Sequence, residues 1–180
     1  MSFNASLGVR YTSTLVRDSI GTPFDVRPAL APALAFTAAT PLERAWAPAV
    51  TLDFSTSSLT RHDADGTSVG LGRVSTVALT VGLTHSLPGG FTTTVAVGGL
   101  KYVPSEQTGI FRSGSGSLAA LGALTLDYPL RLGPHHHLAL EVRYDLHGFT
   151  TPALEDEGFR GSRAVHRVAL TARASFGAPR

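Results

Sequence analysis

Histidine and acidic side chains are the groups of this sequence best suited to bind metal ions, and they occur in short clusters. His135, His136 and His137 form its only histidine run. Neighbouring residues of a strand point to opposite faces, so at most two of these imidazoles could share one ion unless a turn assists. We therefore expect a solvated turn here and predict no metal site.

The segment HDADG, from His62 to Gly66, begins like a calcium-binding loop. A complete loop supplies further oxygen ligands and ends in a glutamate that binds through both oxygens, and these are missing. We expect a polar turn instead. The chain has no cysteine, which excludes disulfides and thiolate chemistry, and we predict no cofactor.

These groups must be positioned by β-strands, because apolar and polar residues alternate along most of the chain. In the last such segment, 165–176, one parity carries apolar residues: Val168, Leu170, Ala172, Ala174 and Phe176. The other parity is polar or small, with Arg167, Thr171 and Arg173. Alternation with a period of two predicts a strand with two unlike faces.

Seven further segments alternate in the same way. They are 3–16, 24–37, 46–60, a long strand ending near 84, 91–98, 117–128 and 138–146. No helical pattern separates them, so consecutive strands are expected to pair antiparallel in an up-and-down order. The sequence therefore predicts an all-β, eight-stranded antiparallel barrel, formed by residues 1–180 as a single domain. No run of about 18 apolar residues occurs, which excludes transmembrane helices.

The composition does not fit an ordinary soluble surface. Charged residues make up 16% and hydrophobic residues 43%, and Lys101 is the only lysine. A formal net charge of +2 is too small and too dispersed to indicate a nucleic-acid partner.

The two faces of the strands differ in a way that predicts which one is inside. The apolar face carries leucine, valine and aromatic residues, whereas the other is rich in alanine and glycine, which suit the narrow interior of an eight-stranded barrel. The polar face also carries equal numbers of basic and acidic residues, and unpaired charge inside a barrel would be costly. We predict a polar, filled lumen with a charge network made of Arg10, Asp25, Arg27, Asp53, Asp127, Glu141, Arg143, Asp145, Arg167 and Arg173.

Aromatic residues on the apolar face gather at one end of the strands. They are Phe3, Phe36, Trp46, Phe91, Tyr128 and Phe176, while Tyr11, Phe24, Phe54 and Tyr144 could form a second girdle at the other end. The eight residues from Phe3 to Tyr11 span about 26 Å of strand, or about 20 Å along a tilted barrel axis. An outer-membrane hydrocarbon band is about 25 Å thick, so the apolar face is predicted to contact lipid.

The whole chain resembles the small eight-stranded outer-membrane β-barrels of Gram-negative bacteria, of the OmpX and OmpA-barrel type. The stretches HSLPGGFTTTVAVGG and YPLRLGPHHHLALEVRYDL look like strand–turn–strand units of such barrels, and the last strand ends on an aromatic residue. The resemblance implies an outer-membrane location, contact with membrane lipid and lipopolysaccharide, and short periplasmic turns. MSFNAS lacks the basic start and apolar run of a secretory signal, so we expect a mature chain without its signal peptide.

Function is then expected to lie in the loops. Eight strands leave no wide channel once side chains fill the interior, so we predict a plugged lumen and no porin-like pore. The longer links 17–23, 61–67, 104–116 and 151–161 could bind partner proteins, surface sugars or lipid head groups, as loops on rigid scaffolds often do. Glu155, Asp156 and Glu157 could hold a cation that bridges lipopolysaccharide phosphates, although a solvated loop is the simpler interpretation. The oligomeric state is not predicted.

Two other functions remain open. Some small barrels of this class modify lipid A through a serine–histidine pair, and Ser13 and His147 both fall near the same rim, but on opposite parities. A soluble lipocalin-like carrier would instead need the large apolar residues inside. We predict a structural or loop-binding barrel that is not an enzyme.

Overall fold

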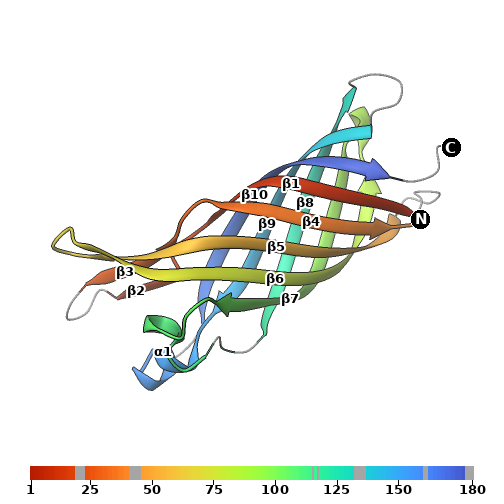
Figure 1. The fold of residues 1–180 in the computed structure, drawn as a ribbon. Coiled ribbons are helices and arrows are strands. Elements are labelled where there is room, and N and C mark those ends of the chain that lie inside the picture. The colour runs from red at the N-terminus through yellow and green to blue at the C-terminus, as the bar shows by residue number, and fades with distance from the viewer. Residues whose placement is uncertain are drawn as a thin grey trace.

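Eight long strands form a closed ring in the computed structural model, which describes residues 1–18, 23–40, 46–114, 116, 118–131, 137–159 and 162–176 (Figure 1). The ring strands are β1 (Ser2–Thr12), β4 (Ala31–Ala39), β5 (Trp46–Asp63), β6 (Ser68–Ser86), β7 (Thr92–Pro104), β8 (Ala119–Arg131), β9 (His137–Phe149) and β10 (Arg163–Phe176). They pair in the order β5-β4-β1-β10-β9-β8-β7-β6, and β6 pairs with β5 to close the ring. The predicted eight-stranded antiparallel barrel is confirmed.

The two ends of the barrel differ in their connections. At one end, which we call the short-turn end, β1 begins and β10 ends side by side, with Phe3 opposite Phe176. A tight turn joins β6 to β7 at the same end, where Gly89 and Gly90 have φ values of 80° and 84° that favour glycine. The opposite, long-loop end carries the remaining small elements.

The second predicted strand is divided in two. Residues 24–37 form β3 (Phe24–Pro28) and β4, and only β4 belongs to the ring. Strand β3 pairs instead with the outer part of β5, where Phe24 lies opposite Asp63, and with the short β2 (Val16–Asp18). Pro28 and Pro32 cannot donate to a ladder, which explains why the pairing changes between them. The hairpin of β5 and β6 extends well beyond the ring (Figure 1).

Two short helical turns interrupt the long links, and the alternating pattern had not predicted them. They are η2 (Gly109–Phe111) and α1 (Pro152–Asp156). Thr151 caps α1, since its hydroxyl accepts a hydrogen bond from the Leu154 amide at 3.3 Å, and Pro152 suits the first turn. None of the described helices is long and apolar enough to cross a membrane.

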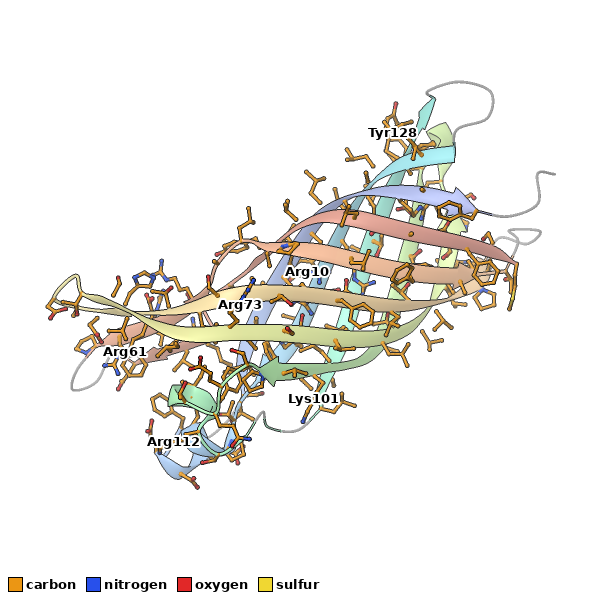
Figure 2. The ribbon with its side chains drawn as sticks, viewed as in Figure 1. Arg10, Arg61, Arg73, Lys101, Arg112 and Tyr128 are labelled. Atoms are coloured by element: carbon orange, nitrogen blue, oxygen red, sulfur yellow. The ribbon has the colours of Figure 1, made fainter. Side chains whose placement is uncertain are left out.

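The outer wall of the barrel is apolar. Exposed large side chains occur on all eight ring strands, among them Leu7, Leu34, Leu52, Leu79, Val97, Leu124, Val142 and Leu170 (Figure 2). Soluble monomers rarely expose continuous apolar patches of more than a few hundred Å². This apolar belt is what a barrel needs where its wall contacts lipid.

Small residues let the strands approach closely on the inner face. An added methyl group at Gly98 would lie 2.0 Å from the Leu79 carbonyl oxygen of the neighbouring strand, and one at Gly8 would lie 2.0 Å from the Leu170 oxygen. Ala33, Ala49 and Ala169 are buried on the same inner face. The alanine and glycine content that predicted the inner face therefore has a direct steric role.

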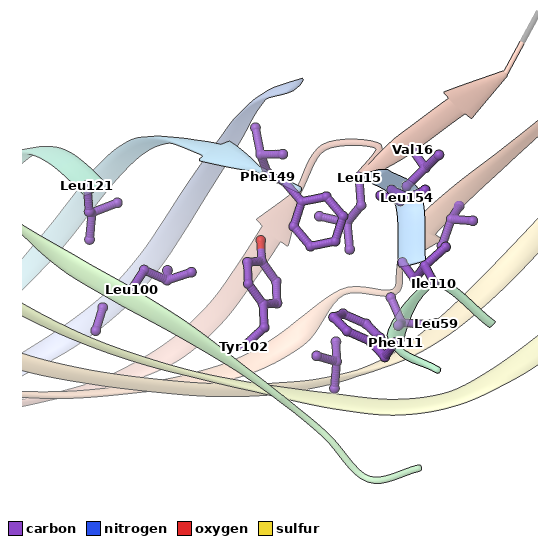
Figure 3. Packing of buried hydrophobic residues seen from close by; sticks show 14 residues of the cluster. Leu15, Val16, Leu59, Leu100, Tyr102, Ile110, Phe111, Leu121, Phe149 and Leu154 are labelled. Atoms are coloured by element: carbon purple, nitrogen blue, oxygen red, sulfur yellow. The ribbon is translucent and has the colours of Figure 1, made fainter. Parts of the chain in front are cut away.

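The lumen is polar only in part. At the long-loop end an apolar cluster fills it, and we did not predict this cluster (Figure 3). Its members are Leu15, Val16, Val26, Leu59, Val74, Ala78, Leu100, Tyr102, Ile110, Phe111, Leu121, Phe149, Leu154 and Val165. Inward positions of the ring strands supply most of these side chains, and the rest come from Leu15, β2, β3, η2 and α1.

Candidate functional site

A buried ion pair joins two strands inside the barrel. Arg10 of β1 donates two hydrogen bonds to the Asp53 carboxylate of β5, from Nη1 to Oδ1 at 2.6 Å and from Nη2 to Oδ2 at 2.5 Å. Both side chains are almost fully buried. Two parallel bonds of this kind fix the guanidinium in one orientation, because the planar fork matches the carboxylate.

Arg167 of β10 extends this pair across the lumen. Its Nη2 donates to Asp53 at 3.4 Å and to the Thr76 hydroxyl of β6 at 3.1 Å. Strands β10 and β6 are four places apart in the eight-membered ring order, so they face each other across the barrel. One side chain therefore spans the lumen at this level.

The remaining charges continue the network toward the short-turn end. Arg143 donates to Asp145 at 2.8 Å and to the Thr80 hydroxyl at 3.4 Å. Arg173 donates to Asp127 at 2.5 Å. The Glu141 carboxylate accepts bonds from the hydroxyls of Ser6, at 3.1 Å, and Thr171, at 3.0 Å, and every acidic group of the network thus has a donor.

Eight of the ten residues predicted for the network lie together in the lumen, and two do not. Asp25 and Arg27 form an ion pair with each other on β3, where the Arg27 side chain is 53% exposed. The Asp25 carboxylate accepts a hydrogen bond from Arg27 and raises the pKa of that guanidinium. Their alternation matched that of the lumen residues, but the inward parity changes between β3 and β4: on β3 the buried side chain is Val26, so Asp25 and Arg27 face away from the apolar cluster.

Tyr102 and His147 mark the boundary between the charged network and the apolar cluster. The Tyr102 hydroxyl lies 2.7 Å from His147 Nε2, and both residues are buried. On the other side of Tyr102 its ring meets Phe149 edge to face at 5.0 Å. The inward parity of both residues could have been read from the sequence, but their contact over the inner face of β8 depends on strand register.

The serine–histidine pair weighed for catalysis is not assembled. His147 bonds to Tyr102 inside the barrel, whereas the Ser13 hydroxyl accepts a bond from the His166 backbone amide at 3.0 Å. The His166 ring bonds to the Tyr144 hydroxyl at 2.6 Å. Among the described residues, no histidine side chain bonds to Ser13 and so none is placed to take its proton.

The loops with acidic clusters use their carboxylates in local contacts. Asp65 accepts bonds from the Thr67 amide at 2.9 Å and the Thr67 hydroxyl at 2.6 Å, which lower the pKa of its carboxyl group. Asp63 pairs with Arg61 and Glu157 with Arg112, both at 2.7 Å. Within the described ranges, no group of three potential ligands could hold a metal ion. His135 and His136 lie outside these ranges, as does the side chain of His137.

The two longest loops are tied together at the long-loop end. The Thr151 hydroxyl donates to the Ile110 carbonyl oxygen at 2.6 Å, and Arg112 bridges to Glu157. Ile110, Phe111 and Leu154 insert into the apolar cluster (Figure 3). The helices α1 and η2 therefore form one cap over the lumen.

The six residues predicted for the first aromatic girdle all lie near the short-turn end. Phe3, Phe36, Trp46, Tyr128 and Phe176 are exposed on the outer wall, and Phe91 packs against Tyr128 with ring centres 5.0 Å apart. Of the second set, Tyr11 and Tyr144 are exposed on the wall. Phe24 is not on the wall: it lies on β3 and packs against the apolar cluster, under Arg61.

The chain matches no protein-family model and no curated protein. Solved structures resemble it over nearly their whole length. The outer membrane protein OprG from Pseudomonas aeruginosa has a TM-score of 0.54 at 14% identity, covering 98% of this chain and 96% of its own. The outer membrane protein AlkL, solved in lipid bilayers, has a TM-score of 0.54 at 14% identity, with 99% and 92% covered. The fold is that of a small outer-membrane β-barrel.

A third structure agrees with this. The attachment invasion locus protein Ail of Yersinia pestis, in complex with the heparin analogue sucrose octasulfate, has a TM-score of 0.52 at 14% identity, with 97% and 98% covered. The predicted resemblance to this class is confirmed. Because the apolar belt also covers all eight ring strands, the chain is an integral barrel of the outer membrane.

Proposed function

We propose that this chain is a single-domain outer-membrane barrel with a closed lumen, whose long-loop end acts as a binding surface. The proposal rests on the side chain of Arg167, which crosses the lumen and bonds to Asp53 and Thr76 on the far side of the ring. A side chain held in this way leaves no room at its level for a wide aqueous channel.

Two further layers support a closed lumen. The apolar cluster lies beyond the charged network, and Leu100, Val165 and Phe111 in it are almost fully buried. The cap formed by α1 and η2 covers this cluster and is fixed by the Thr151 and Arg112 contacts. A solute would have to displace all three layers to pass.

The same cap supports a binding role. Loops that are fixed to a rigid scaffold present side chains in a defined arrangement, which lowers the entropy lost on binding. Ail, a barrel of the same fold, has been solved with a heparin analogue. We propose lipid and lipopolysaccharide as the surroundings of the wall and an extracellular ligand at the long-loop end, and no nucleic-acid partner.

We propose no catalytic role, because Ser13 and His147 bond to different partners. The test of this part is mass spectrometry of lipid A from cells that express the chain. An unchanged acyl pattern is expected, and a changed pattern would favour a lipid A-modifying enzyme.

Planar-bilayer recording tests the closed lumen. The refolded barrel should give no steady conductance and at most small, irregular events. Arg167→Ala should increase the frequency of such events, since it removes the side chain that spans the lumen, while the exposed Arg73→Ala should not. Steady single-channel conductance of porin size from the unchanged chain would contradict the proposal.

A further inference from the structure

A small cavity lies between β2 and α1 at the long-loop end. Its volume is about 110 Å³, and its apolar wall consists of Leu15, Val16, Phe149, Leu154 and Phe159. Thr150, Arg17 and Arg163 complete the lining, and both arginines are exposed. We call this space the β2–α1 cavity.

The two arginines of this cavity form no ion pair within the described part of the chain. Neither Arg17 nor Arg163 forms an ion pair with any residue that the structure describes, and no described carboxylate lines the cavity. Asp18, Asp25 and Asp63 line a neighbouring cavity with Arg17, and Asp25 lies opposite Arg17 in the β2–β3 ladder, but Asp25 and Asp63 form their ion pairs with Arg27 and Arg61. Glu155 accepts a bond from the Thr150 hydroxyl. The β2–α1 cavity therefore combines an apolar interior with two arginines that form no ion pair with a described residue.

A second cavity on the other side of Leu154 provides a comparison within the same molecule. Its volume is about 170 Å³, and it is also lined by apolar side chains and two arginines, Arg61 and Arg112. Both of those arginines are already paired, with Asp63 and Glu157 at 2.7 Å. An anion would have to compete with these carboxylates there, but not in the β2–α1 cavity.

The apolar wall is held in place before any ligand arrives. Leu15, Val16, Phe149 and Leu154 belong to the buried apolar cluster, and Figure 3 shows them gathered on one side of it. Leu154 is fixed by the Thr151 cap of α1, and Phe159 packs against the cluster from outside. A preformed pocket spares a ligand the cost of ordering its walls.

We propose that the β2–α1 cavity binds a short alkyl carboxylate. Its carboxylate would be held by Arg17 and Arg163, whose forked donors suit that group. Its terminal carbons would lie against Leu154 and Phe149. A cavity of about 150 Å³ lined by apolar side chains holds benzene, so the smaller space here suits a tail of only a few carbons and not a full lipid chain. This inference rests on the proposal that the long-loop end binds ligands, and names one class of ligand.

The proposal is tested with the full chain in lipid nanodiscs and 5,5,5-trifluoropentanoate as the probe, followed by ¹⁹F NMR. Saturable binding is expected, above the signal from protein-free nanodiscs. Arg17→Gln combined with Arg163→Gln should weaken it by about tenfold or more, because both charge-assisted contacts are lost. The matched pair Arg61→Gln and Arg112→Gln should leave the affinity within about twofold of the parent.

Two further probes test the contributions of the carboxylate and of the alkyl tail separately. The neutral 5,5,5-trifluoropentanol should bind more weakly than the carboxylate to the parent, and trifluoroacetate should bind more weakly because it lacks the tail. Phe159→Ala should weaken pentanoate binding and leave the heat-dependent gel mobility of the folded barrel unchanged.

Three outcomes would contradict the assignment of this cavity. The first is no saturable binding of the carboxylate by the parent. The second is binding by the Arg17→Gln, Arg163→Gln variant that is as tight as binding by the parent. The third is binding of the alcohol by the parent that is as tight as that of the carboxylate. None of these results would contradict the closed lumen, because that proposal is contradicted only by steady conductance of the unchanged chain.

Discussion

Arg167 and Thr76 hydrogen-bond at 3.1 Å although their strands stand opposite each other in the ring. Arg167 is 1% exposed, so its charge has to be compensated within the lumen by Asp53 and Asp145. The barrel interior therefore depends on contacts made across the lumen, in addition to those between neighbouring strands.

Breaking the Arg10–Asp53 pair should strongly destabilise the barrel. Asp53→Asn leaves Arg10 without its bidentate partner in a buried site, at a cost of about 3–5 kcal/mol. Asp63→Asn, which breaks the partly exposed pair with Arg61, should cost less than about 1 kcal/mol. Urea titration of folding into lipid vesicles measures both, and equal midpoints for the two variants would contradict a buried network.

Gly98 should not tolerate a side chain. Its added methyl group would meet the Leu79 carbonyl oxygen at 2.0 Å, so Gly98→Ala has to separate β7 from β6. A methyl group added at Gly70 would have no other residue's atom within 4 Å, so Gly70→Ala provides the control. We expect a lower urea midpoint for Gly98→Ala only, and the same titration decides it.

The lipid-facing assignment of Leu170 can be tested against its neighbour. Leu170 is 48% exposed on the outer wall, so Leu170→Arg should cost roughly 2–4 kcal/mol in a bilayer. Thr171 faces the lumen, and Thr171→Ser keeps the hydroxyl that bonds to Glu141. If both variants fold into lipid with the stability of the parent, Leu170 does not contact the hydrocarbon.

We expect the long-loop end to face the cell exterior and the short-turn end to face the periplasm. The chain has no cysteine, so single replacements can be labelled cleanly. Asp156→Cys, in the cap at the long-loop end, should react with an impermeant maleimide on intact cells. Leu87→Cys, 37% exposed in the turn after β6, should react only after the cells are opened. The reverse labelling pattern would mean that the long-loop end faces the periplasm.

The hairpin tip of β5 and β6 should respond to acid through Asp65. Hydrogen bonds from Thr67 lower the pKa of its carboxyl group below the ordinary value of 3.8. A lowered pKa means that the contact stabilises the turn above about pH 4 and is lost as the pH falls through the folded-state pKa. Carbon-detected NMR titration should place the midpoint of Asp65 below 3.8 in the parent and return it toward that value in Thr67→Ala.

Much of the fold could be predicted from the sequence because the side-chain alternation of a strand is a local property. Leu170 and Arg167 fall on opposite parities, and they lie on opposite faces of the wall. The same reasoning placed eight of ten charged residues in the lumen. It failed for Asp25 and Arg27, because the chain leaves the ladder between β3 and β4 and the inward parity changes there, so that Val26 is the buried residue of β3.

The contacts across the lumen and the cap were decided by the tertiary structure alone. Which acid Arg167 meets depends on how far each strand is shifted along its neighbour, and those shifts add up around the whole ring. Ile110, Phe111 and Leu154 come from long links without periodicity, so nothing in their spacing indicated that they would fill the barrel mouth. The alternation of a strand is a property of neighbouring residues, whereas the partners of a side chain inside a closed barrel are set only when all eight strands are in register.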